Sequence, residues 1–127
     1  MPLIKIEVSE GFDRYDLLKK RDSIMDSVVE SLQLPPDDRN IRIIEYTQDF
    51  FAMKNPYKML IEISLFLGRT KETKKRLFQT IVNNLESIGL IKKAEVFIIL
   101  NEQPLANWGV RGGIPADEIN LDFKVEI

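Results

Sequence analysis

The chain has 127 residues, of which 44% are hydrophobic and 30% charged, a composition typical of one globular domain. Its 18 basic and 20 acidic residues give a net charge of −2, and the basic residues are spread along the chain, so no nucleic-acid partner is expected. No apolar run approaches a membrane span, and the first residues lack a secretory signal pattern. We therefore expect a cytoplasmic protein without a membrane partner.

The chain contains no cysteine and no histidine. Disulfides, thiolate nucleophiles and Ser-His-Asp triads are therefore excluded, and the commonest metal ligands are missing, so we expect neither a metal nor a cofactor. Acid–base chemistry near neutral pH then needs a perturbed carboxylate, lysine or tyrosine, or the terminal amine. Among these groups, only the α-amino group has an ordinary pKa, about 7.7–8.0, close to working pH.

The first half of the chain predicts a strand, a helix and a second strand. Apolar residues alternate with charged ones over residues 3–8, which indicates a strand. Asp13 is expected to cap a helix that runs to about Gln33, because Pro35 follows. Residues 41–46 then predict the second strand.

The same order repeats in the second half. Residues 59–66 predict a strand, and Thr70 is expected to cap a helix. Gly89 and Leu90 predict the end of this helix, with the glycine in a left-handed conformation. Residues 95–100 predict the fourth long strand, so the chain contains strand–helix–strand twice.

The segments outside these two units are less regular. Residues 47–57 are expected to form a loop, and a glycine-rich turn follows later at residues 109–113. The alternating residues 121–127 predict a short C-terminal strand.

These elements predict a single α/β domain made of an approximate repeat, residues 1–55 and 56–102, and an extension, residues 103–127. Two β-α-β units with right-handed crossovers place both helices on one face of a four-stranded mixed sheet. The nearly continuous apolar strand at residues 96–100 indicates a sheet covered on both faces, so we expect a second copy of the chain on the other face. The same order also fits an antiparallel ferredoxin-like sandwich, in which case the chain is a non-catalytic module that binds a small ligand or a partner.

Pro2 is the candidate catalytic base. Removal of Met1 leaves the proline with a secondary amine at the first residue of a strand, where no ladder hydrogen bond is lost. An apolar pocket and nearby cations both lower the pKa of such an amine towards neutrality. The amine can then take a proton from a carbon next to a carbonyl, or attack the carbonyl itself.

Four short motifs occur in order along the chain. They are MPLIKIEV at the start, LPPDDR at residues 34–39, Arg69-Thr70 at the second helix and Asn107-Trp108-Gly109 near the end. Together they resemble the tautomerase superfamily, with the fold of 4-oxalocrotonate tautomerase and macrophage migration inhibitory factor. The chain is most similar to the longer members related to malonate semialdehyde decarboxylase. This resemblance implies a homotrimer or related multimer, with each active site near the terminal proline and completed by neighbouring subunits.

The resemblance also implies roles for particular residues. An aspartate that acts with the proline matches Asp38, which is otherwise a solvated turn residue. Of two arginines that hold a substrate carboxylate, Arg69 matches the second, whereas Leu67 replaces the first. Trp108 is expected to form a wall of the pocket or to anchor a subunit interface, and Arg111 is a candidate second cation.

The expected function is keto–enol isomerisation of small 2-oxo or enol carboxylates such as phenylenolpyruvate, without a cofactor. Pro2 shuttles the proton, Arg69 holds the carboxylate, and Asp38 orients Pro2 or a water molecule. The alternatives within the family are decarboxylation and hydrolytic dehalogenation, in which Asp38 activates water or polarises the substrate. A further alternative is a member that has lost its activity.

Overall fold

The computed structural model of the chain describes residues 1–89 and 91–127. Its longer elements are β1 (Leu3–Ser9), α1 (Arg14–Leu32), β2 (Ile41–Tyr46), β3 (Met59–Phe66), α2 (Lys71–Ile88) and β4 (Val96–Gln103). Two short strands, β5 (Gly109–Val110) and β6 (Ile114–Pro115), form a hairpin in the C-terminal extension. None of the described helices has the length and apolar character needed to cross a bilayer.

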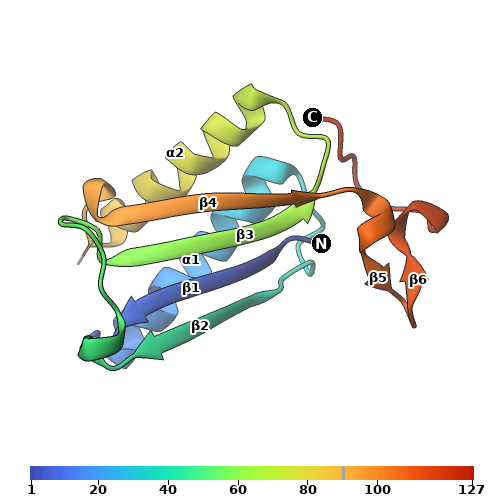
Figure 1. The fold of residues 1–127 in the computed structure, drawn as a ribbon. Helices are drawn as coiled ribbons and strands as arrows, with labels where there is room; N and C mark the ends of the chain where they lie inside the picture. Colours follow the sequence, from blue (N-terminus) through green and yellow to red (C-terminus); the bar gives the residue numbers. More distant parts are fainter. Residues whose placement is uncertain (90) are drawn as a thin grey trace.

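The four long strands form one mixed sheet in the order β2-β1-β3-β4 (Figure 1). The outer pairs β1–β2 and β3–β4 are parallel, whereas the central strands β1 and β3 are antiparallel. Two β-α-β units related in this way confirm the predicted mixed sheet. The ferredoxin-like alternative was wrong, because it requires antiparallel neighbours throughout.

Both helices cover the same face of the sheet, as predicted (Figure 1). α1 begins where Asp13 accepts hydrogen bonds from two backbone amides of the first turn, and Thr70 caps α2 through the Thr73 amide. The hydroxyl of Ser27 accepts a 2.9 Å hydrogen bond from Asn84 and so joins the two helices. The core between helices and sheet contains the fully buried side chains Ile4, Ile6, Val8, Ile24, Val28, Ile61, Ile63, Leu77, Ile81 and Leu85.

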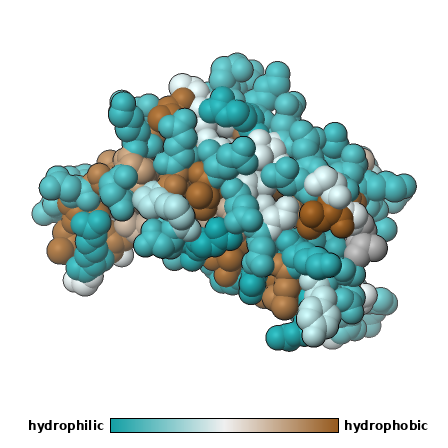
Figure 2. Space-filling view, turned by 180° about the vertical axis from the view of Figure 1, so that it is seen from behind, coloured by the Kyte–Doolittle hydropathy of each residue, from teal (hydrophilic) through white to brown (hydrophobic). Residues whose placement is uncertain are grey.

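The opposite face of the sheet is only partly covered. Leu3, Phe97 and Ile99 remain 40%, 43% and 44% exposed, although they lie in long strands. The outer side of the helices, in contrast, is mainly hydrophilic (Figure 2). The face of the sheet away from the helices therefore carries exposed apolar side chains, beside the charged cluster of Lys5, Glu7 and Glu62.

Three details differ from the sequence analysis or lie beyond it. The C-terminal strand expected at residues 121–127 is not formed; Ile127 instead accepts hydrogen bonds through its carbonyl oxygen from the hydroxyls of Thr70 and Thr73. Gly89 has a φ of 85° but a ψ of 174°, so it is not in the expected left-handed helical conformation, and Leu90 lies outside the described residues. Lys20, in the middle of α1, is 1% exposed and was not expected in the core.

Candidate functional site

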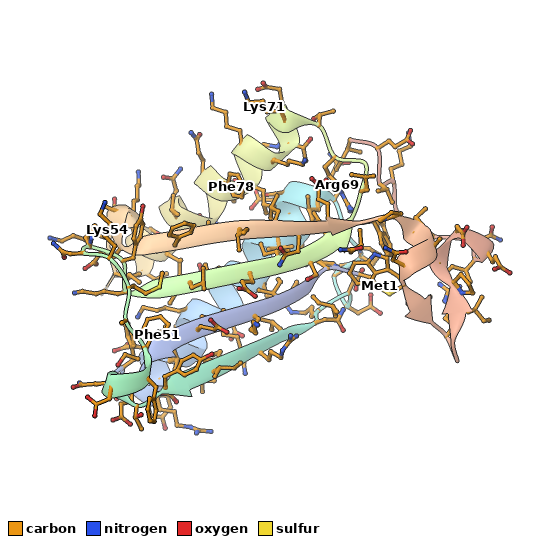
Figure 3. The ribbon with its side chains drawn as sticks, viewed as in Figure 1. Met1, Phe51, Lys54, Arg69, Lys71 and Phe78 are labelled. Carbon is orange, nitrogen blue, oxygen red and sulfur yellow. The ribbon has the colours of Figure 1, made fainter. Side chains whose placement is uncertain are left out.

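The amino terminus lies at the end of the sheet where β3 ends. Because β1 and β3 are antiparallel, Leu3 pairs with Ser64 and the residues before β1 lie close to those that follow β3. The turn between α1 and β2 reaches the same end, where Asn40 accepts a 2.9 Å hydrogen bond from the Ile4 amide. Met1 and Arg69 therefore lie at one end of the sheet, near the C-terminal extension (Figure 3).

The Met1 amine donates a hydrogen bond to Asp38 and forms an ion pair with its carboxylate. The turn holds Asp38 in position: its own amide donates to Pro35, and its second carboxylate oxygen accepts from the Asn40 side chain at 3.2 Å. Burial lowers the pKa of the Met1 amine below its ordinary value. The Asp38 carboxylate raises this pKa and the Arg69 charge lowers it, but burial prevails.

Pro2 is buried at the start of β1, next to this amine. One residue spans at most about 3.6 Å along the backbone, so the Pro2 nitrogen lies within that distance of the Met1 nitrogen. A terminal imino group on Pro2 would therefore lie in the same partly buried surroundings, beside the Asp38 carboxylate and under the influence of the Arg69 charge.

Arg69 is held by the residues that end β3. Its side chain is only 6% exposed, and one terminal nitrogen donates a 3.1 Å hydrogen bond to the Phe66 carbonyl. Its Nε is buried without a hydrogen-bond partner among the described residues. Burial lowers the pKa of this guanidinium while Glu102 raises it, but an arginine stays protonated in proteins. The Nε–H of Arg69 is thus a buried donor without a partner, and Arg69 does not itself line the cavity beside Met1.

A cavity of about 220 Å³ opens beside the amino terminus. Met1, Asp38 and Arg111 line it, together with residues of the turn before β2 and of the C-terminal segment. Arg111 is exposed and has a positive φ of 50°, in the turn that joins β5 to β6. The structure therefore brings Pro2, Asp38, Arg69 and Arg111 to one end of the sheet.

Trp108 does not line this cavity. Its ring packs edge-on against Phe66 with 5.0 Å between ring centres, and its indole N–H donates to the Gln103 carbonyl at 3.4 Å. The Phe66 carbonyl also accepts the hydrogen bond from Arg69. Trp108 therefore contacts the residue that positions Arg69 and does not contact the cavity.

The sequence analysis did not identify the C-terminal segment as part of this region. The ring of Phe123 stacks on Phe66, with 6.1 Å between centres, and lies 5.9 Å below the Arg69 guanidinium. Val125 covers Gly68 so closely that a Cβ there would lie 2.8 Å from the valine side chain. The alternation of residues 121–127 was the available signal, but it was interpreted as a strand.

Leu67, at the position where the resemblance implies the first of two arginines, is 56% exposed. Arg69 is therefore the buried guanidinium of this loop. Among residues 1–89 and 91–127, no group of three histidine, cysteine, aspartate or glutamate side chains is placed to hold a metal ion.

Comparison with known proteins identifies the family. Residues 38–111, more than half of the chain, match the model of a family described as tautomerase enzyme. The chain therefore belongs to this tautomerase family, as its motifs predicted. The matched region runs from Asp38 to Arg111 and includes Arg69 and Trp108.

Individual relatives agree with this assignment. The chain is 27% identical over 122 residues to the probable tautomerase YusQ of Bacillus subtilis (strain 168), covering 89% of this chain and 95% of the relative. FG41 malonate semialdehyde decarboxylase, solved with the inhibitor 3-bromopropiolate, is 27% identical with a TM-score of 0.72 over 84% of this chain and 86% of that one. A fused 4-OT symmetric trimer shares the fold, with a TM-score of 0.80 at 20% identity over 91% and 96% of the two chains.

Proposed function

We propose that the chain is a tautomerase that interconverts the enol and keto forms of small 2-oxo carboxylates, with the Pro2 nitrogen as base after removal of Met1. The observation that carries this proposal is the position of the amino terminus. It lies partly buried between a carboxylate, Asp38, and the charge of a buried guanidinium, Arg69. Burial and the Arg69 charge both favour the neutral amine, which is the form that accepts a proton.

The proposed reaction is a proton shuttle. The neutral Pro2 nitrogen takes the hydroxyl proton of the enol, and the ammonium thus formed returns a proton to the neighbouring carbon as the carbonyl forms. The bound carboxylate accepts hydrogen bonds from Arg69, whose Nε has no partner among the described residues. Asp38 accepts a hydrogen bond from the ammonium and so orients Pro2.

Two further predicted residues act around this centre in our proposal. Arg111 lines the cavity and supplies a second positive charge to the substrate carboxylate. Trp108 holds Phe66 in place and thereby supports the carbonyl that orients Arg69. The Phe123 ring lies against the Arg69 guanidinium and blocks access to it. Our proposal therefore requires the segment around Phe123 to move aside when a carboxylate binds Arg69.

We also propose that the chain forms a homotrimer through the exposed face of the sheet. Leu3, Phe97 and Ile99 leave apolar surface on that face, whereas the helices turn a mainly hydrophilic side to solvent (Figure 2). The fused 4-OT neighbour is a symmetric trimer. Native mass spectrometry is expected to give three times the chain mass, and Phe97→Glu is expected to yield monomers. A monomeric unmodified protein would contradict this arrangement.

The experiment that tests the proposed activity compares two forms of the amino terminus. Processed protein that begins at Pro2 and protein with a non-cleavable residue before Pro2 are each assayed for ketonisation of phenylenolpyruvate by ultraviolet absorbance. We expect the extended form to lose about 100-fold or more of kcat/KM, since an amide nitrogen cannot accept the proton. Equal activity of the two forms would exclude Pro2 as the base.

Decarboxylation of a 3-oxo acid is the second candidate function. It is favoured by the contact between the terminal amine and Asp38, and by the likeness to malonate semialdehyde decarboxylase. Leu67 in place of one of the two arginines weakens the hold on a substrate carboxylate and favours tautomerisation instead. If the protein released carbon dioxide from malonate semialdehyde faster than it ketonised phenylenolpyruvate, decarboxylation would become the first candidate function and tautomerisation the second.

A further inference from the structure

The two ends of the sheet have corresponding backbone segments, with the same strand register and a glycine at equivalent positions. β1 pairs with β2 at Ile4 and Ile41, and β3 pairs with β4 at Met59 and Val96, a separation of 37 positions in each case. Gly11 follows β1 with a φ of 122°, and 57 positions later Gly68 follows β3 with a φ of 144°. The end of β1 and the start of β3 therefore form a counterpart of the candidate site at the opposite end of the sheet.

This correspondence extends to an ion pair. At the candidate site, the Met1 amine pairs with Asp38. At the opposite end, Lys58 immediately precedes β3, and its Nζ lies 2.9 Å from a carboxylate oxygen of Glu95. Lys58 follows Met1 by 57 positions, and Glu95 follows Asp38 by the same number. Each end thus has an amine and a carboxylate beside the start of a central strand.

The two ends differ at the residue after the glycine. Arg69 follows Gly68, whereas the matching position after Gly11 is Phe12. Phe12 lines a cavity of about 450 Å³, which exceeds the 220 Å³ of the cavity beside Met1. The buried guanidinium at one end is replaced by an aromatic ring at the other.

Three aromatic side chains contribute to the walls of this second cavity. Phe51 and Tyr57 line it together with Phe12 and Met53, and all four side chains are half-buried. Phe51 stacks on Tyr46 at 5.5 Å between ring centres, and Tyr57 packs on Phe97 at 4.9 Å, so both rings are supported from behind. Phe51 lies at the end of the molecule away from Met1 (Figure 3).

The polar groups of the lining carry opposite charges. Lys58 supplies an ammonium with three donors, one of which is directed to Glu95, while Glu10 adds a carboxylate. Behind the lining, the Lys20 ammonium lies 5.2 Å from the centre of the Phe12 ring, and burial lowers the pKa of this lysine. Ser9 and Gln48 also line the cavity, so the lining offers several hydrogen-bond donors to a carbonyl, whereas its only cation, Lys58, is paired with Glu95.

We propose that the cavity between Phe12, Phe51, Met53, Tyr57 and Lys58 is a second ligand site, which binds a small uncharged aromatic carbonyl compound. The aromatic side chains hold the ring of the ligand, and the Lys58 ammonium donates a hydrogen bond to its carbonyl oxygen. This site is separate from the Pro2 chemistry, so it stands or falls independently of the proposed tautomerase activity.

Binding of 4-hydroxyacetophenone, with 4-hydroxybenzoate as its charged analogue, tests the proposal. In ¹⁵N–¹H spectra of the whole chain, the Gly11 amide reports on the second cavity. The indole of Trp108, the only tryptophan, reports on the opposite end. We expect the ketone to shift the Gly11 signal without shifting the indole signal. We expect the carboxylate to bind this cavity more weakly, by about tenfold, because the lining has no unopposed cation.

Two neighbouring phenylalanines provide a matched pair of variants. Phe51→Ala removes a wall of the cavity and is expected to weaken ketone binding about tenfold, whereas Phe50→Ala, at a ring that is 79% exposed and outside the lining, leaves it unchanged. Circular dichroism verifies that both variants are folded. In a second test, Phe12→Arg introduces at this end the arginine that the opposite end has at the matching position. This variant is expected to bind 4-hydroxybenzoate more tightly than 4-hydroxyacetophenone.

Three results overturn the proposal. The first is a ketone that shifts only the Trp108 indole, since the ligand then binds at the opposite end. The second is equal affinity of the Phe51→Ala and Phe50→Ala proteins. The third is the absence of any shift at millimolar ketone in the unmodified chain.

Discussion

The two ends of the sheet combine similar backbones with different side chains, and this difference underlies the ligand that we propose for each end. Gly68 leads into Arg69, a buried cation close to the terminal amine, whereas Gly11 leads into Phe12, a ring that lines the second cavity. Each end keeps an amine–carboxylate pair, Met1 with Asp38 and Lys58 with Glu95. In our proposals, the residue after the glycine distinguishes an anion site from a site for a neutral ring.

The largest effect is expected from the terminal residue itself. Pro2→Ala in the processed protein replaces the ring imino group by a more mobile primary amine, and we expect kcat/KM for phenylenolpyruvate to fall about 10²- to 10⁴-fold. Pro104→Ala, at an exposed proline that does not line the cavity beside Met1, is the matched control and should stay within about twofold. Nearly full activity of Pro2→Ala would remove the proposed base while leaving the fold assignment intact.

Arg69→Met is expected to have the next largest effect. Methionine fills the space but loses the charge-assisted hydrogen bonds to the carboxylate, so KM should rise about 10- to 100-fold. The loss should disappear with the methyl ester of the same substrate, and Arg76→Met, at an exposed position of α2, should behave like the unmodified protein. An equal loss with acid and ester would indicate a structural role for Arg69.

The pH profile of activity distinguishes the effect of Asp38 on the terminal amine from that of its counterpart Glu95. Asp38 raises the pKa of the terminal amine, and the neutral amine is the active form in our mechanism. Asp38→Asn should therefore move the acid limb of kcat/KM to lower pH, and Arg69→Met, which removes a charge that lowers this pKa, should move it to higher pH. Glu95→Gln should leave the limb in place. Shifts of opposite sign would contradict the proposed mechanism.

The smallest effect concerns stability. Lys20 on α1 and Leu77 on α2 are 57 positions apart and both buried, but only Lys20 carries a charge. Lys20→Met should raise the thermal midpoint by about 2–6 °C, because the buried ammonium has no ion-pair partner among the described residues.

The pH dependence of the increase in thermal midpoint tests whether the charge of Lys20 is its cause. Burial lowers the pKa of Lys20 from 10.5, so the folded protein binds the proton less well than the unfolded chain does. The cost is complete below the lowered pKa and diminishes as pH rises towards 10.5. The advantage of Lys20→Met should therefore narrow in that range, while Lys19→Met, at an exposed position, should change little. A midpoint lowered by Lys20→Met would contradict this account.

Local sequence signals predicted most of the fold. Alternating residues defined the long strands, and the expected caps Asp13 and Thr70 are the observed ones. The C-terminal segment was misassigned because its alternation of residues 121–127 reflects packing of one side against the loop after β3, not pairing with a strand. Alternation reports which side of a segment is buried, but it does not identify the partner.

The candidate site was predictable where a motif specified it. The motif LPPDDR led to Asp38, which contacts the terminal amine, and Arg69 was identified from its position before α2. The contribution of Phe123 and the cavity beside Phe12 depend on contacts between segments far apart in the sequence, so no local pattern indicated them. The burial of Lys20 was missed for the same reason, since a lysine in an amphipathic helix is ordinarily placed at its edge.

A nitrogen NMR titration of Pro2 tests the central claim most directly. In processed protein with ¹⁵N-labelled proline, the terminal nitrogen is followed against pH in the folded state and again in urea. We predict a lower pKa in the folded protein, because burial and Arg69 outweigh the opposing charge of Asp38. An equal or higher pKa in the folded state would contradict the proposal that this end of the sheet makes Pro2 a base.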